Sequence, residues 1–280
     1  MTRIDLHVHT TTSDGTLTPA AVTARARGFG LAAIAITDHD TVEGVAEAVR
    51  AGKELGVEVV PGIELSCYYR GREVHVLGYF IDIASASLAE TIRTVTENRK
   101  ARNHIIAERM AADGLPVSID ELKCRFPHTV IGRPHFAEVL VEHGLADSVS
   151  DAFARYLNRG RPYFEPQKRM NMDEAAAAIN AAGGLAVLAH PYQYRYSEAE
   201  MRRLFADFKS CGSTGIECFY SGYDAEKSAF LTSAAAGLGM CVTGGSDFHG
   251  SVKPDIELGS GKGGLNVDRE LLNKLKERIK

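Results

Sequence analysis

Short apolar runs recur along the chain and alternate with stretches of helical periodicity. Runs rich in β-branched residues predict strands at residues 4–8, 32–37, 57–65, 73–80, 185–189, 215–219 and 240–243. Helical patterns occupy 19–27, 42–55 and 173–182, and an amphipathic helix with a charged face is predicted at 268–280. Thr18 followed by Pro19 is typical of a helix start. Strands that alternate with helices predict an α/β fold with a largely parallel sheet.

The strand signal disappears between residues 88 and 163. Helical patterns occupy 88–112, 119–126, 135–143 and 149–157 in this stretch. We interpret it as a helical insertion that interrupts the sheet after its fourth strand. The expected organisation is therefore a first sheet part at 1–87, an insertion at 88–163 that caps the substrate site, and a second sheet part at 164–280.

Composition excludes several classes of protein. With 45% hydrophobic residues in 280, the chain can bury a large core, which excludes a fully disordered chain. No run approaches the ~18 apolar residues of a membrane span and no secretion signal is evident, so we expect a cytoplasmic protein without membrane association. The net charge of −4 argues against stable binding of duplex nucleic acid. Five cysteines without a C-x-x-C pair argue against disulfides or a thiolate zinc site.

Imidazole and carboxylate groups gather where the predicted strands end. In parallel α/β barrels the chemistry lies at the carboxyl ends of the strands, so such residues are expected to meet at one mouth. Side chains alternate along a strand, so His7 and His9 point to one side, as would Asp247 and His249 if that strand continued so far. The candidate metal ligands are His7, His9, Asp14, His39, Glu64, His75, His190, Asp247 and His249.

This ligand set points to bound cations. A single strand histidine is more often a core residue than a ligand, but six buried histidines with several carboxylates would be electrostatically costly without cations. Mixed imidazole and carboxylate donors suit manganese, iron or zinc better than magnesium or calcium. Nine donors are too many for one ion, so we expect two or three divalent ions, an arrangement that suits displacement at phosphorus.

Several motifs, in this order along the whole chain, resemble the polymerase and histidinol phosphatase (PHP) superfamily. They are His7-x-His9, Thr37-Asp38-His39-Asp40, Gly62-Ile63-Glu64, the separate His75 and His190, and Ser246-Asp247-x-His249. The resemblance implies a distorted seven-stranded (β/α) barrel, interrupted by the helical insertion, and a trinuclear metal site. Manganese is the leading candidate for the bound ions, and iron or zinc is the alternative. The resemblance also implies three ligand sets: His7, His9, Glu64 and Asp247; Glu64, His75 and His190; and Asp14, His39 and His249.

Asp14 departs from the pattern of some family members, which carry histidine at its position in Ser13-Asp14-Gly15-Thr16. An aspartate in such a loop also commonly organises a turn through its own side chain. We favour a ligand, because the loop directly follows the strand that carries His7 and His9. Together with His39 and His135, Asp14 is expected to act in catalysis.

Two segments of the insertion narrow the resemblance. Ile131-Gly132-Arg133-Pro134-His135-Phe136 and Asn158-Arg159-Gly160-Arg161-Pro162-Tyr163 resemble the branch of 3′,5′-nucleoside bisphosphate phosphatases and 5′–3′ exoribonucleases. Independently, a proline in a first helical turn beside an arginine predicts an anion site. Arg99 and Arg102 are expected to share a helix face, although an exposed charged face is the usual alternative. The expected phosphate-binding residues are Arg99, Arg102, Arg133, Pro134, His135 and Arg161.

These observations together predict hydrolysis of a phosphate monoester. The leading hypothesis is removal of the 3′-phosphate from nucleoside 3′,5′-bisphosphates, with His135 contacting phosphate or protonating the leaving oxygen. The alternatives are 5′–3′ exonucleolytic cleavage of short 5′-phosphorylated RNA at the same site, histidinol-phosphate hydrolysis, and a non-catalytic metal-binding module. The expected partner is a small nucleotide or a short RNA, and no protein partner is implied.

Overall fold

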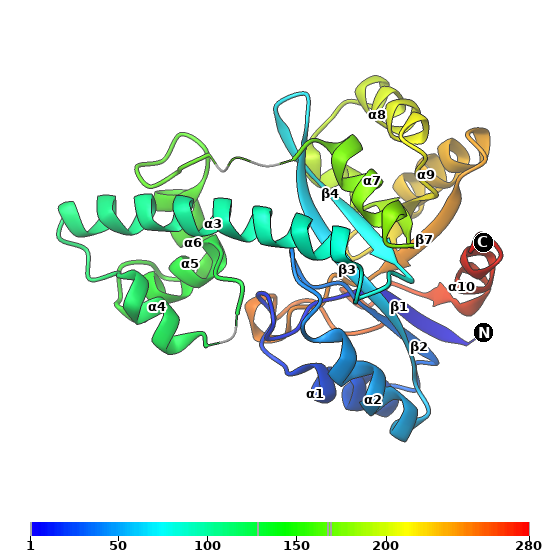
Figure 1. The fold of residues 1–280 in the computed structure, drawn as a ribbon, viewed down its shortest axis with the longest axis horizontal. Helices are drawn as coiled ribbons and strands as arrows, with labels where there is room; N and C mark the ends of the chain where they lie inside the picture. The colour runs from blue at the N-terminus through cyan, green and yellow to red at the C-terminus, as the bar shows by residue number, and fades with distance from the viewer. Residues whose placement is uncertain (1, 128, 167, 169, 280) are drawn as a thin grey trace. The chain divides into compact units, whose positions relative to one another are not determined.

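The chain forms two compact units in the computed structural model, which describes residues 2–127, 129–166, 168 and 170–279. The barrel unit comprises Met1–Thr91 and Met170–Lys280, and the helical unit comprises Ile92–Arg169 (Figure 1). Helix α3 (Ala86–Ala112) runs across the first border between the two units. The chain therefore leaves the barrel unit after Thr91 and returns to it at Met170.

The barrel unit is built on an eight-stranded sheet with the order β7-β6-β5-β4-β3-β2-β1-β8. The strands are β1 (Arg3–Val8), β2 (Ala33–Ile36), β3 (Glu58–Tyr69), β4 (Arg72–Tyr79), β5 (Leu185–Leu188), β6 (Gly215–Tyr220), β7 (Cys241–Gly245) and β8 (Val267–Asp268). The segment after β7 meets β1, since Val8 forms a parallel bridge with Phe248 and Asp247 N donates to His7 O at 2.9 Å. This contact nearly closes the sheet, and the α/β barrel predicted from the sequence is confirmed.

The barrel differs in its strand count from the predicted one, and one of its long strands runs against its neighbours. The sheet has eight strands rather than seven, because β8 is a two-residue strand that pairs antiparallel with β1 and is too short to give an apolar pattern. In addition, β4 is antiparallel to both β3 and β5. Arg70 and Gly71 join β3 to β4 with φ angles of 48° and 77°. A two-residue turn with both φ angles positive matches the twist of a hairpin, so this connection reverses the chain.

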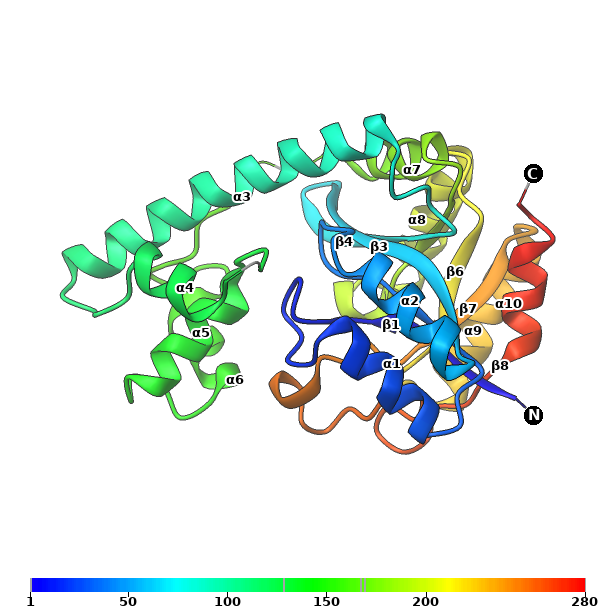
Figure 2. The same cartoon turned by 60° about the horizontal axis from the view of Figure 1, so that its bottom comes forward.

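Helices pack on the barrel strands according to the alternation of apolar side chains. In β2, Ile34 and Ile36 pack in a cluster with residues of α1 (Pro19–Gly28) and α2 (Val45–Leu55), which lie side by side (Figure 2). Ala33 and Ala35 instead join a cluster that includes residues of α10 (Arg269–Lys276). The predicted start of the first helix is confirmed, because Thr18 Oγ1 accepts from Ala21 N at 3.2 Å.

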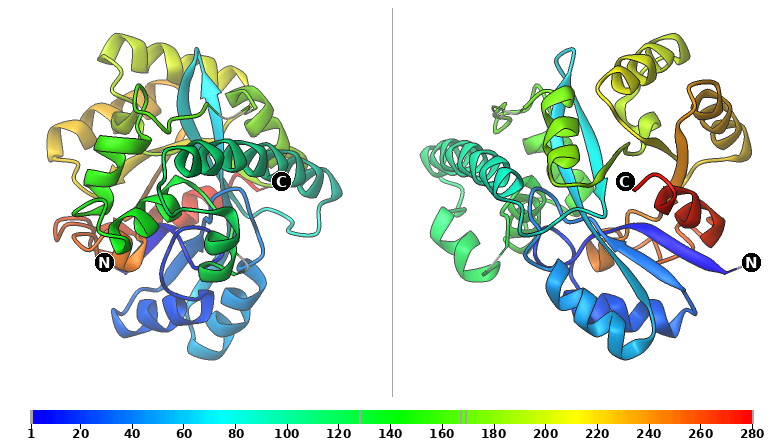
Figure 3. Two further views of the ribbon diagram at one scale, coloured as in Figure 1. Left: turned by 90° about the vertical axis from the view of Figure 1, so that its left-hand side faces the viewer. Right: turned by 45° about the vertical axis from the view of Figure 1, so that its right-hand side comes forward.

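The remaining helices of the barrel unit follow the later strands. They are α7 (Met172–Ala181), α8 (Glu198–Ser210) and α9 (Ala225–Gly237), and α9 contacts β6, β7 and α8 (Figure 3). The helical unit contains most of α3, α4 (Ile119–Arg125), α5 (Arg133–Glu142), α6 (Val149–Ala152) and the π-helical turn η1 (Phe153–Leu157), around its own apolar core. Within the described part of the chain, no helix has both the length and the apolar character that crossing a membrane requires.

Closure of the barrel leaves no room for a side chain at Gly245, the last residue of β7. A β-carbon added there would lie 2.4 Å from both His7 Cβ and His7 N. We expect Gly245→Ala to lower the free energy of unfolding by at least about 1–3 kcal/mol, the usual cost of overpacking. Gly237→Ala is the matched control, since a β-carbon at this position in α9 meets nothing within 4 Å. Urea unfolding of both variants checks this, and equal stabilities would contradict it.

Candidate metal centre

The structure brings all nine candidate ligands together at one edge of the barrel unit. Most follow the carboxyl end of a parallel strand, where successive loops converge. His75 reaches the same edge from the beginning of β4, because the antiparallel direction of β4 places its amino end there. The carriers are β1 (His7), the loop after β1 (His9, Asp14), the loop after β2 (His39), β3 (Glu64), β4 (His75), the turn after β5 (His190) and the loop after β7 (Asp247, His249).

Three details of this edge differ from the sequence prediction. Glu64 lies inside β3, which continues to Tyr69. His75 is near the start of its strand rather than at its end. Strand β7 ends at Gly245, and Asp247 has a φ angle of 59°, so Asp247 and His249 are not alternating residues of one strand. Such backbone conformations are costly for residues other than glycine and are concentrated at functional sites.

Glu64 is the central side chain of the cluster. Its Oε1 lies 3.0 Å from both His75 Nδ1 and His190 Nε2. Its Oε2 lies 3.1 Å from His39 Nδ1, 3.2 Å from His9 Nε2 and 3.4 Å from His7 Nε2. The two carboxylate oxygens therefore face different groups of histidines, which is the geometry of a carboxylate that can bridge two ions.

Asp247 has only one oxygen directed at the histidines. Its Oδ1 lies 3.4 Å from His9 Nε2 and 3.3 Å from His249 Nδ1. Its Oδ2 accepts hydrogen bonds from Tyr220 and from Lys253, both at 2.6 Å. Neither Tyr220 nor Lys253 belongs to a sequence motif, and only the folded loop after β7 brings Lys253 to this carboxylate, so neither was predicted from the sequence.

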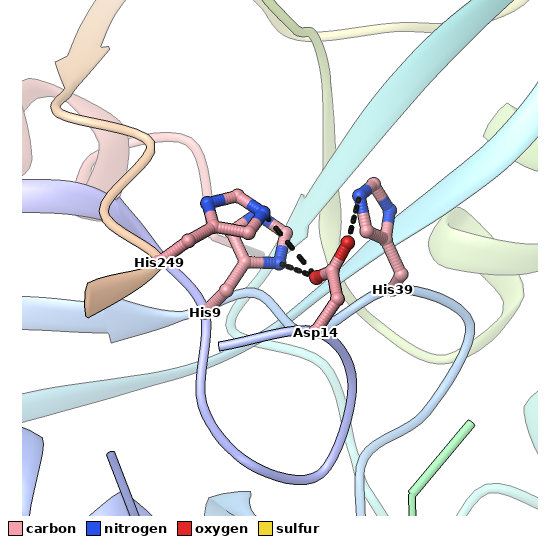
Figure 4. A group of neighbouring side chains, drawn as sticks. All are labelled: His9, Asp14, His39 and His249. Carbon is pink, nitrogen blue, oxygen red and sulfur yellow. Dashed lines mark ion pairs between the residues drawn. The ribbon is translucent and has the colours of Figure 1, made fainter. Parts of the chain in front are cut away.

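Asp14 returns toward the cluster because the loop after β1 folds back on itself. Ser13 N and Gly15 N both donate to Thr10 O. Asp14 Oδ1 then lies 3.2 Å from His249 Nε2 and 3.6 Å from His9 Nδ1, and Oδ2 lies 4.0 Å from His39 Nε2 (Figure 4). Figure 4 shows the carboxylate directed at the three imidazole rings rather than at its own backbone. The Asp14 carboxylate therefore lies where it could bind a metal ion together with these histidines, as expected.

Burial and opposite charges perturb the ionisation of this cluster. Burial opposes the charged form of Glu64, yet the histidines around it hold its pKa well below the ordinary value. Burial likewise opposes ionisation of Asp247, but Lys253 and His249 hold its pKa well below normal. Burial also lowers the pKa of His39, to about 3. The cluster thus combines ionised carboxylates with an imidazole that favours the neutral, ligand-competent form.

The donor set fits divalent ions. Ligands about 2.0–2.2 Å from one ion lie roughly 3–3.5 Å apart, which is the separation of the Glu64 oxygens from their histidines. Among the described residues, His39 Nδ1, Glu64 Oε2 and His190 Nδ1 are buried and make no hydrogen bond. In the described part of the chain, four overlapping groups have donor atoms within 4.8 Å of one another: His9, Asp14, His39 and His249; His7, Glu64 and His190; His7, His9 and Asp247; and His39, Glu64 and His75.

The residues expected to bind phosphate lie on α3, at the start of α5 and in a later turn. A β-carbon at Gly132, which precedes α5, would lie 3.1 Å from Arg99 Nη1. On the same helix, Arg102 Nε donates to Asn103 Oδ1, and Asn103 Nδ2 donates to Ile131 O at 2.9 Å. Arg99 and Arg102, both buried, therefore belong to the α3 surface that packs on the segment before α5.

The first turn of α5 contains three more of the residues that are expected to bind phosphate. Arg133 and Pro134 begin the helix, and the Arg133 guanidinium lies 5.6 Å from the centre of the Phe164 ring. His135 is buried, and its Nδ1 accepts from Gly132 N at 2.9 Å. This capping contact was not predicted from the sequence. A neutral His135 ring therefore carries its proton on Nε2.

Arg161 lies in a turn between η1 and α7, in which its backbone N–H donates to Asn158 O at 2.9 Å. Its side chain is exposed. Within the part of the chain that the structure describes, no hydrogen bond or ion pair joins the Arg161 side chain to the arginines of α3 or to α5. Its role in phosphate binding stays a prediction.

A barrel that collects imidazoles and carboxylates at one edge defines the class of metal-dependent hydrolases. The model of the PHP domain matches residues 5–167, and the chain belongs to the PHP family. The family resemblance inferred from the sequence motifs is thereby confirmed, as is the class of metal-dependent phosphoesterase, whose members use divalent ions.

Relatives of known or assigned activity match over most of the chain. The 5′-3′ exoribonuclease Rnm of Escherichia coli is 36% identical over 91% of this chain and 87% of its own length. The 3′,5′-nucleoside bisphosphate phosphatase of Chromobacterium violaceum is 32% identical over 100% of this chain and 98% of its own. A solved structure from Bifidobacterium adolescentis, assigned to the metal-dependent phosphoesterases, has a TM-score of 0.89 at 32% identity and covers 99% of this chain and 96% of its own.

Glu64→Gln tests the central position of this carboxylate. The substitution keeps the volume but removes the negative charge and one acceptor oxygen. We expect Mn²⁺ at 100 times its Kd to stabilise the wild-type protein by about 2.7 kcal/mol, because it binds only the folded state, and expect Glu64→Gln to lose most of this stabilisation. Glu58→Gln is the control, since Glu58 lies on the same strand but pairs with Arg269 and Lys276. Thermal unfolding with and without Mn²⁺ measures the effect, and an equal response of both variants would refute it.

Proposed function

We propose that this protein hydrolyses the 3′-phosphate of nucleoside 3′,5′-bisphosphates, releasing phosphate and a nucleoside 5′-monophosphate. The observation that carries the proposal is the gathering of nine imidazole and carboxylate ligands in a chain that matches a 3′,5′-nucleoside bisphosphate phosphatase from end to end. Cleavage of short 5′-phosphorylated RNA from its 5′ end is the second candidate, and the relatives named as 5′-3′ exoribonucleases favour it. Both reactions displace a ribose oxygen from phosphorus, so one centre can serve both.

The proposed ligand sets, which follow the family resemblance, are His7, His9, Glu64 and Asp247 for one ion, Glu64, His75 and His190 for a second, and Asp14, His39 and His249 for a third. Two or three divalent ions held there, with manganese as the leading candidate and iron or zinc as alternatives, would neutralise charge on a phosphoryl group and lower the pKa of water. The distances from Glu64 to His75 and His190 support the second set, and the Asp14 contacts support the third.

His39 and Asp14 are proposed to face the reacting phosphate. Their side chains keep 17% and 12% of their surface exposed, whereas Glu64 keeps 1%. A phosphate that enters from solvent can therefore reach His39 and Asp14 before the deeper ligands. Lys253, which remains partly exposed beside Asp247, adds positive charge at the same rim. These side chains would orient the phosphoryl group, while the buried side chains of Glu64, His7 and His9 would bind the ions beneath it.

The helical unit is proposed to bind the phosphate that is not removed. Arg99, Arg102 and Arg133 provide guanidinium groups that match phosphate geometry, and Pro134 belongs to the first turn of α5, where backbone N–H groups favour anions. The proton on Nε2 of a neutral His135 suits a hydrogen bond to phosphate or transfer to a leaving oxygen. Arg161 is retained as a further candidate. A cytoplasmic location and the lack of a stable protein partner also remain predictions.

A panel of four substrates tests the proposed reaction. Adenosine 3′,5′-bisphosphate, adenosine 5′-monophosphate, histidinol phosphate and a 5′-phosphorylated short RNA are incubated with protein and Mn²⁺, and phosphate release and product length are measured. We expect the bisphosphate to give phosphate and the 5′-monophosphate. Turnover of histidinol phosphate alone would refute the substrate assignment. Mononucleotide release from the RNA alone would favour the exoribonuclease, and no turnover with any divalent metal would support a non-catalytic metal-binding module.

Two variants separate the proposed metal and substrate roles. His39→Ala removes a proposed metal ligand. We therefore expect this variant to contain less bound metal and to have a lower kcat than the wild-type protein. Arg102→Ala is expected to raise KM by roughly 10–100-fold with a smaller effect on kcat, because it removes a charged hydrogen bond to substrate. Arg93→Ala is the control on the same helix, where Arg93 is exposed and pairs with Glu97. Metal content and steady-state kinetics provide the measurements, and equal KM values for Arg93→Ala and Arg102→Ala would refute the substrate role.

A further inference from the structure

Glu217 is a buried carboxylate in β6 that none of the sequence motifs includes. Its side chain has no exposed surface. Its Oε1 lies 3.0 Å from His7 Nδ1, and its Oε2 accepts from His190 N at 2.8 Å. One side chain therefore joins β6 to two candidate ligands, one on β1 and one in the turn after β5.

The contact with Glu217 selects one form of the His7 ring. A carboxylate oxygen can only accept, so His7 must carry a proton on Nδ1 to make this hydrogen bond. In the neutral ring, the free electron pair then lies on Nε2. That atom faces the cluster, 3.4 Å from Glu64 Oε2 and 3.6 Å from Asp247 Oδ1. Glu217 thus presents to the cluster the nitrogen that is able to bind a metal ion.

The second oxygen of Glu217 acts on backbone rather than on a ring. His190 has a φ angle of 24°, a conformation that residues other than glycine rarely adopt. The hydrogen bond from His190 N to Glu217 holds the residue in this turn, from which its Nε2 reaches Glu64 Oε1 at 3.0 Å. Both contacts of Glu217 therefore fix the direction of a candidate ligand.

We propose that Glu217 is a positioning residue of the metal centre, which sets the Nδ1–H form of His7 and the turn at His190 so that both Nε2 atoms face the ions. This inference rests on the proposed metal centre. A carboxylate behind a metal-binding histidine raises the basicity of the ring and fixes its orientation, and loss of such a partner commonly lowers metal affinity 10–100-fold. Glu217 itself does not contact the proposed ions or the substrate.

Glu217→Gln is a sharp test, because glutamine has the same shape but only one acceptor oxygen. If that oxygen faces His190 N, the amide NH₂ group faces His7 Nδ1 and favours the ring form with its proton on Nε2, which cannot bind an ion there. If the amide oxygen faces His7 instead, the NH₂ group lies against the His190 N–H group. Both groups are donors, so the hydrogen bond to His190 is lost. Either orientation disturbs one ligand without creating a cavity, so the fold is expected to survive.

The control variant is Tyr79→Phe. Tyr79 is buried in the same unit, and its hydroxyl group donates to Leu6 O at 2.9 Å. Among the residues that the structure describes, this hydroxyl group makes no hydrogen bond to a candidate ligand. It reports what the loss of one buried hydrogen bond does to the barrel. We expect Tyr79→Phe to lower the unfolding temperature while keeping the wild-type affinity for Mn²⁺ in calorimetric titration. Glu217→Gln is expected to weaken Mn²⁺ binding at least tenfold.

Nitrogen-15 NMR of the histidine side chains in the Zn²⁺-loaded wild-type protein provides a second readout, which does not depend on the folding of Glu217→Gln. We expect His7, assigned by its loss in His7→Ala, to carry its proton on Nδ1. A proton on Nε2, or unchanged Mn²⁺ affinity in Glu217→Gln, would overturn the inference. If His7→Ala also kept the wild-type affinity, the proposed metal centre itself would fail, so the two failures are distinguishable.

Discussion

The structure of this site depends on one buried carboxylate. Glu64 lies within 3.4 Å of nitrogen atoms from five histidines, and these come from β1, β4 and the loops after β1, β2 and β5. Burying an ionised carboxylate without compensation costs several kcal/mol. Imidazoles alone compensate it only if they are protonated, and protonated imidazoles do not bind metal. Divalent ions remove this conflict, because they neutralise Glu64 and leave the histidines as neutral ligands.

The barrel closure and the β3–β4 hairpin both serve this arrangement. The absence of a side chain at Gly245 lets β7 approach β1 closely enough to place the loop after β7 beside His7. The two-residue turn at Arg70 and Gly71 reverses the chain, so that a residue near the start of β4 reaches the edge where the parallel strands end. The positive φ angle of Asp247 then turns its carboxylate toward the cluster. Tight backbone geometry therefore positions ligands that strand alternation alone would not bring together.

Sequence periodicity was sufficient for the barrel strands and for the candidate ligands, because apolar runs and polar strand ends are local signals. Sequence periodicity did not predict features that depend on contacts between residues far apart in the chain. The two-residue β8 is defined by its pairing with β1. The direction of β4 depends on a turn in which Arg70 has a positive φ angle, a conformation that arginine rarely adopts. Glu217 was missed although it is a lone acid in an apolar strand, since only the closed barrel brings it to His7. The capping contact of His135 likewise needs the folded start of α5.

The chain is similar both to a relative named as an exoribonuclease and to one named as a bisphosphate phosphatase. The nine candidate ligands alone therefore do not determine the substrate. A centre that neutralises a phosphoryl group acts in the same way on a terminal 3′-phosphate and on an internucleotide phosphate. Any preference between the two must therefore come from groups that recognise what lies beyond the reacting phosphate. In this chain, the arginines of α3 and the first turn of α5 have the appropriate chemistry, since a guanidinium matches the geometry of a phosphate group. The helical unit, rather than the barrel, is where differences in substrate preference within the family are expected to arise.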